Sequence, residues 1–248
     1  MDVKLKLLKE FYAGLPHDRA KIETEEFGFD FLAGLLSGGA VLDYGELTLT
    51  RLLHKYKLIQ IPQRQIDDLL LAHIKKQCNV CLYFDDVANN LFCFNLDNNH
   101  KQNNTVIIPE MALAVASLRE YLTGLGCEPL VIASGRGYHV WCRLAGKIEN
   151  VRLFRFMIKA AAHVMEILAN NNYDYNKIKF NFYPDIRIEN LVSLRLFGSE
   201  HAKNKTFSSI CTADGQLNEP QSWQYFEDYL KYKTIAETAF LRVCQDIF

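Results

Sequence analysis

Hydrophobic residues recur at helical spacing in several parts of this chain. The first fifteen residues predict an amphipathic helix, because apolar side chains recur among charges at Leu5, Leu7, Leu8, Phe11 and Leu15. A second apolar stripe predicts a helix over 66–77 and places His73 in the core or at its boundary. The segment 47–53 fits either a strand or the start of a helix. Further helices are predicted over 26–36, 109–125, 151–170, 221–232 and 234–247.

Shorter apolar runs, rich in branched and aromatic side chains, predict strands over 81–84, 91–96, 130–133, 138–144, 177–183 and 191–197. A polar connection of hairpin type, 85–90, joins the first two of these runs. Residues 130–144 predict a second hairpin, since Gly135 and Gly137 bracket Arg136 where the backbone reverses.

Alternation of side chains along these strands predicts which residues share a face. His139 lies on one face of its strand with Trp141 and Arg143. In the strand over 91–96, Phe94 and Leu96 point one way. The opposite face therefore carries Cys93, Asn95 and, just beyond the strand, Asp97.

The order of these elements predicts an α+β fold. The strand over 91–96, the helix over 109–125 and the strand over 130–133 form a βαβ-like unit, which places Asp97 and the 134–139 turn in one sheet. We expect a mainly helical N-terminal region over 1–75, a core over 76–215, and C-terminal helices over 216–248 that pack on this core.

Composition narrows the function classes. The chain has 248 residues, 49% of them hydrophobic, and its formal net charge is -1, so any contact with nucleic acid must be local. The longest apolar run is too short to cross a bilayer, and charges at Lys4, Lys6 and Lys9 argue against a signal peptide. We therefore expect no membrane partner.

Seven scattered cysteines fit reduced thiols in a cytosol-like compartment. Cys78 and Cys81 have zinc-knuckle spacing without a second pair, which favours two core thiols over a zinc site.

One face of the 134–139 turn gathers a hydroxyl, a guanidinium and an imidazole, from Ser134, Arg136 and His139. This set suits an anionic phosphate, because Arg offers a fork of donors and glycines let backbone N–H groups approach it. The alternative is a surface hairpin with a hydrogen-bonded histidine. Further candidate phosphate ligands, with a solvated basic loop as the alternative, are Arg195, His201 and Lys203.

Nucleotidyl transfer also needs carboxylates that hold divalent metal. The candidates are Asp97 and Asp185. Taken in order, three stretches of the chain resemble the archaeo-eukaryotic primase superfamily of primases and primase-polymerases. They are FCFNLDNNH with Asn95 and Asp97, SGRGYHVW over 134–141, and PDIRIENLVSLRLFGSEHAKNK over 184–205. The resemblance covers about residues 80–210.

This resemblance implies a primase-polymerase-type mixed sheet with flanking helices, and template-directed nucleotide polymerisation with two Mg²⁺ or Mn²⁺ ions. It implies that Asp97 and Asp185 hold metal together with Asn95. The triphosphate of the nucleotide would be held by Ser134, Arg136, His139, Arg195, His201 and Lys203. The implied partners are a single-stranded DNA template, nucleoside triphosphates, and a helicase or another replication protein, at a cytoplasmic or nucleoid location.

Asn95 departs from the family pattern, because an acidic residue is expected at its position. An amide oxygen ligates a hard cation more weakly than a carboxylate. Three explanations compete: an engineered inactive variant, a natural module that binds nucleotides or DNA without polymerising, and an active enzyme that recruits Glu189 or Asp86 beside Asp185. A metal-dependent nuclease or phosphatase is a further alternative, but it leaves the phosphate-binding residues unexplained.

Overall fold

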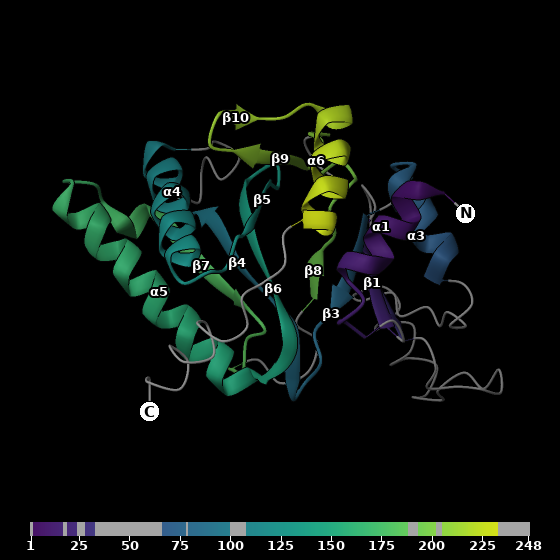
Figure 1. Ribbon diagram of the computed structural model, residues 1–248, viewed down its shortest axis with the longest axis horizontal. Coiled ribbons are helices and arrows are strands. Elements are labelled where there is room, and N and C mark those ends of the chain that lie inside the picture. Colours follow the sequence, from purple (N-terminus) through teal and green to yellow (C-terminus); the bar gives the residue numbers. More distant parts are fainter. Residues whose placement is uncertain are drawn as a thin grey trace, which may run out of the picture.

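Two antiparallel sheets and the helices around them make up the described part of the protein (Figure 1). The computed structural model describes residues 2–16, 19–23, 28–32, 66–77, 79–99, 108–187, 193–201 and 205–232. The predicted α+β class is confirmed. Within the described ranges, no helix is both long enough and apolar enough to cross a lipid bilayer.

The larger sheet has six strands in the order β10-β9-β5-β6-β4-β7. Their bounds are β4 Ala88–Asn98, β5 Leu130–Ala133, β6 Gly137–Glu149, β7 Ile178–Tyr183, β9 Ser209–Thr212 and β10 Gly215–Gln216. β4 and β5 both pair antiparallel with β6, so they run parallel to each other. Helix α4, Pro109–Gly124, connects them, which confirms the strand–helix–strand unit.

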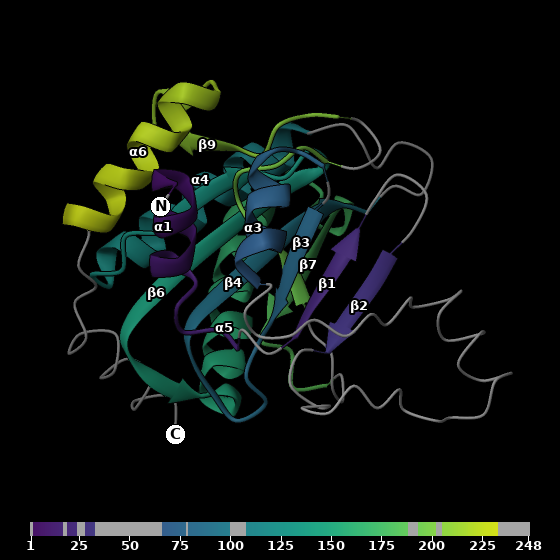
Figure 2. The ribbon, with the colours of Figure 1, turned by 90° about the vertical axis from the view of Figure 1, so that its right-hand side faces the viewer.

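The smaller sheet has the order β2-β1-β3-β8, with β1 Arg19–Glu23, β2 Gly28–Leu32, β3 Asn79–Tyr83 and β8 Ser193–Arg195. Figure 2 shows β1 and β2 beside β3. The predicted hairpin between 81–84 and 91–96 is wrong, because β3 pairs with β1 and β8 while β4 belongs to the other sheet. The turn after β3 changes sheets, and Asn89 and Asn150 hold it by hydrogen bonds to the Asp85 carbonyl at 2.8 and 2.7 Å.

The N-terminal region contains strands as well as helices. α1, Val3–Phe11, and α3, Ile66–Ile74, confirm two predicted helices. The helix predicted over 26–36 is wrong where β2 pairs with β1. Phenylalanines at 27, 29 and 31 repeat every second position, which suits one face of a strand better than one face of a helix. The segments 47–53 and 234–247 lie outside the described residues.

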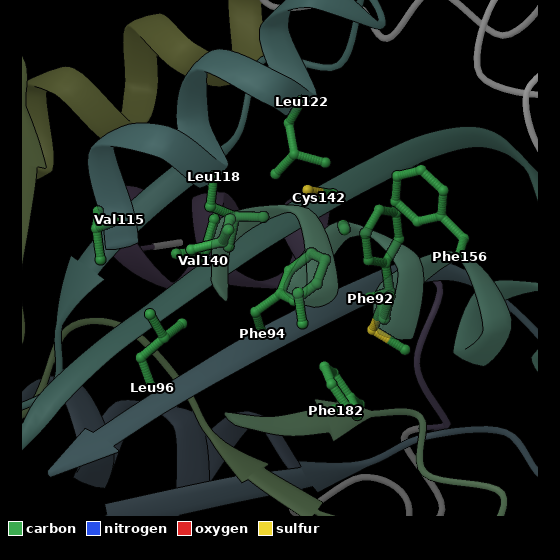
Figure 3. Packing of buried hydrophobic residues seen from close by; sticks show 14 of the residues in the cluster. Phe92, Phe94, Leu96, Val115, Leu118, Leu122, Val140, Cys142, Phe156 and Phe182 are labelled. Carbon is green, nitrogen blue, oxygen red and sulfur yellow. The ribbon is translucent and has the colours of Figure 1, made fainter. Parts of the chain in front are cut away.

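Helices α4 and α5, Asn150–Asn170, cover one face of the six-stranded sheet (Figures 1 and 3). Phe92, Phe94 and Leu96 of β4 pack there with Val140 and Cys142 of β6, as Figure 3 shows. This packing confirms the alternation predicted for both strands. A short helix, η2 Tyr175–Lys177, leads from α5 into the edge strand β7.

The opposite face of this sheet packs against the smaller sheet and against α1, α3 and α6, Glu219–Tyr232. Trp141 lies at its centre, with the Phe11 and Tyr12 rings 6.1 and 5.2 Å from its ring. His73 is fully buried, as predicted; its Nδ1 accepts from the Val80 N–H at 3.0 Å and its Nε2 lies 3.0 Å from the Phe197 carbonyl.

Candidate functional site

A cavity of about 220 Å³ opens where the two sheets meet. Strands β3 and β8 of the smaller sheet line one side, and β4, β6 and the turn between β5 and β6 line the other. Seven of the nine residues proposed from the sequence line this cavity: Asn95, Asp97, Ser134, Arg136, His139, Arg195 and His201. Cys81, Tyr183, Ser193 and Leu194 complete the lining.

Pairing across three strands sets the spacing of the polar side chains. Asn95 of β4 pairs with His139 of β6 on one side and with Asn181 of β7 on the other. Paired residues of antiparallel strands project to the same face, so these three side chains form one row. Asp97 pairs with Gly137 and Lys179 and begins the next row.

The turn between β5 and β6 depends on its two glycines. Gly135 has φ +91°, and the Ser134 N–H donates to the Gly137 carbonyl at 2.8 Å, which closes a two-residue hairpin. A Cβ at Gly137 would lie 1.9 Å from the Leu96 carbonyl oxygen. Only glycine therefore lets the turn lie this close to β4, which brings Arg136 beside Asp97.

Two guanidinium groups face the cavity from opposite sheets. Arg195 of β8 is 8% exposed and donates to the Ser134 carbonyl. Arg136 comes from the turn and is half-buried. In the part of the chain that the structure describes, Asp97 is the one carboxylate of the lining, so these lining residues carry a net positive charge with the histidines neutral. Such a cavity favours an anion.

His139 is neutral in this setting. Burial, followed by the positive charges of Arg195, Arg136 and the neighbouring His201, lowers the pKa of His139 from 6.5 to about 3. As a neutral imidazole it still offers one N–H donor to a ligand.

The Asp97 carboxylate is held by two amides. Asn95 Nδ2 donates to Asp97 Oδ2 at 3.0 Å, and Asn181 Nδ2 donates to the same oxygen at 3.4 Å. Asn95 is buried, and its Oδ1 has no hydrogen-bond partner in the part of the chain that the structure describes. The sequence analysis missed Asn181. Its signal was the alternation Phe180-Asn181-Phe182, which places the polar side chain on the strand face opposite the two aromatic ones.

Asp185 is not among the residues that line the cavity, so the lining does not bring it together with Asp97, and their pairing at one metal site stays a prediction. β7 reaches Cys93, about 13 Å along β4 from Asp97, before the chain turns off towards Asp185. Arg187 binds the Asp185 carboxylate at 2.7 Å and lies over the Phe154 ring of α5 at 5.0 Å. Burial raises the pKa of Asp185, but the hydrogen bonds and charge of Arg187 outweigh burial and lower it.

The other proposed ligands divide into two groups. Asp86 is exposed in the turn before the first residue of β4, and it is not among the residues that line this cavity. Glu189, Lys203 and Cys78 lie outside the described residues. Cys81 is buried and lines the cavity as a reduced cysteine.

A two-metal site does not fit this set of residues. Two divalent ions need several carboxylates between them. Among the described residues the cavity lining offers Asp97 alone, and two amide donors already engage one of its oxygens. Across the described ranges, no three His, Cys, Asp or Glu side chains are grouped so that they could hold a metal ion.

Comparisons with known proteins were made at three levels. No protein-family model matches the chain, and no curated protein matches it. Among solved structures, one similar chain is the polymerase domain of Mycobacterium tuberculosis Ligase D in complex with DNA. The TM-score is 0.49 at 10% sequence identity, over 98% of this chain and 88% of the other. At this level of similarity, function has to be argued from the cavity itself.

Proposed function

We propose that the cavity binds the phosphate groups of a nucleotide, in a primase-like domain that does not carry out two-metal polymerisation. The observation that carries this proposal is the meeting of Arg136 and Arg195, from different sheets, on one cavity whose described lining has a single carboxylate. The family resemblance of the SGRGYHVW turn supports the same ligand class.

Burial strengthens the hydrogen bond that each donor of the cavity would make to a phosphate. Hydrogen bonds between a guanidinium and a phosphate are charge-assisted, and they strengthen where water is excluded. Arg195 is nearly buried, and its hydrogen bond to the Ser134 carbonyl limits the movement of its guanidinium. The hydroxyl of Ser134 and the neutral ring of His139 add uncharged donors beside it.

Nucleotidyl transfer with Mg²⁺ or Mn²⁺ is the second candidate. One observation favours it: Asp97 lies on the same cavity as the arginines, and Mg²⁺ is often bound by one carboxylate together with substrate phosphates. Binding of a single-stranded DNA template or of a helicase follows from the family resemblance and has no support in the cavity.

Titration of the intact protein with ATP in EDTA tests the proposal. Arg136→Met should weaken binding about 10- to 100-fold, because a hydrogen bond to a charged group contributes about 1.5–3 kcal/mol. Arg152→Met is the matched control, since Arg152 is an exposed arginine of α5, the helix that covers the other face of the sheet. Equal affinities for wild type and Arg136→Met, or no binding by wild type, would overturn the proposal.

A further inference from the structure

The amides of Asn95 and Asn181 occupy the place where a cation would neutralise Asp97. Both point an Nδ2 group at Asp97 Oδ2, at 3.0 and 3.4 Å. They come from neighbouring strands and are paired across the sheet, so the backbone register fixes their position. The carboxylate thus receives its hydrogen bonds from the protein itself.

This arrangement opposes a divalent ion. A hard cation at Asp97 would compete with two N–H donors for Oδ2, and these donors carry partial positive charge toward the same point. A half-buried carboxylate without such donors would carry a desolvation cost, which a cation would relieve. Here the amides remove that cost.

We propose that Asn95 and Asn181 make this site independent of divalent cations, so that it binds phosphate through the arginines and the uncharged donors beside them, without a metal ion. The inference rests on the proposed function for its ligand. The claim that the two amides disfavour a divalent cation at Asp97 does not depend on phosphate binding. Oδ1 of Asn95, buried and without a partner among the described residues, is the acceptor left for a hydroxyl or amino group of the same ligand.

Direct Mn²⁺ titration without nucleotide tests the inference. Wild type should show no Mn²⁺ binding beyond that of a variant changed only at the protein surface. The Asn95→Asp/Asn181→Asp variant should bind Mn²⁺ at least about tenfold more tightly, because affinity for hard cations rises with the number of carboxylates. Asn171→Asp adds one carboxylate at an exposed position after α5 and serves as the control for added negative charge away from the cavity.

The double variant puts three carboxylates together and risks unfolding without metal. Mn²⁺ should then raise its melting temperature and leave that of wild type unchanged, since a ligand of the folded state stabilises it. If the double variant does not fold, Asn181→Asp alone is judged by the same criteria, because Asn181 is only half-buried.

Two results would overturn the inference: Mn²⁺ binding by wild type as tight as by the variant, or a folded variant without any gain. No nucleotide is present, so both results are independent of phosphate binding. As a second readout, ATP should bind wild type with the same dissociation constant in EDTA and in Mg²⁺. A clear gain in Mg²⁺ would also count against the inference.

Discussion

Arg195 donates a hydrogen bond from its guanidinium to the backbone carbonyl of Ser134, and this contact joins the two sheets at the cavity. β8, which carries Arg195, belongs to the smaller sheet, and the turn that begins at Ser134 belongs to the larger one. The residue proposed to bind phosphate therefore also sets the distance between the two sides of its site.

Replacing Arg195 should destabilise the protein as well as weaken binding. Arg195→Met leaves the buried Ser134 carbonyl without this donor, at a cost of about 1–3 kcal/mol in the free energy of unfolding. Urea denaturation measures this loss. Arg152→Met, at the exposed Glu149 pair, should change it by less than about 0.5 kcal/mol. A loss no larger than that of the control would show that the contact does not join the sheets.

Gly137→Ala should disturb the turn and lower stability by about 1–3 kcal/mol, because its Cβ would lie 1.9 Å from the rigid Leu96 carbonyl oxygen. Gly124→Ala is the control, since a Cβ at this end of α4 meets nothing within 4 Å. It should be neutral or stabilising by up to about 1 kcal/mol. Thermal unfolding compares the two, and equal melting temperatures would contradict the close approach.

Stability should fall in mild acid. Burial, outweighing the hydrogen bond to Phe197, lowers the pKa of His73 to about 4, and the pKa of His139 is about 3. The unfolded chain takes up these protons near pH 6.5, so it binds more protons than the folded protein between that pH and pH 3–4. Stability is therefore present above about pH 6.5 and is lost as pH falls through this window.

Urea unfolding at several pH values measures this dependence, which has a slope of up to about 1.4 kcal/mol per pH unit for each histidine. His73→Gln can keep one donor and one acceptor but does not titrate. It should be less stable at pH 7 and should show a shallower decline. An unchanged slope would mean that His73 is protonated in the folded protein.

Template-directed synthesis should be absent. Incubation of wild type with a primed DNA template, nucleotides and Mn²⁺ should give no extension, because the described residues of the cavity lining supply one carboxylate where two metals need several. Asp97→Ala distinguishes a true activity from a contaminating one. Extension by wild type that disappears in Asp97→Ala would establish nucleotidyl transfer in place of binding alone.

Local patterns predicted much of this site. The period of two along β4 and β6 placed Asn95, Asp97 and His139 on one face, and the glycines placed Arg136 at the turn. These features depend on neighbours within the same strand or hairpin. Alternation and turn chemistry are properties of such short segments, so they can be recognised in a sequence.

Features that depend on pairing between distant segments were not predictable in this way. The register of β7 on β4 brings Asn181 to Asp97 and carries Asp185 past it, and nothing local to residues 178–187 sets that register. The prediction of a hairpin between β3 and β4 was wrong for the same reason. β3 pairs with β1 and β8, and both of these strands lie far from it in the sequence.

The most direct test of the central claim is a crystal structure of the intact protein with ATP and Mn²⁺. We predict that the phosphate groups lie in the cavity between Arg136 and Arg195. We also predict that no Mn²⁺ ion, located by its anomalous signal, is bound to Asp97. Phosphates placed elsewhere, or any Mn²⁺ held at Asp97, would contradict this account.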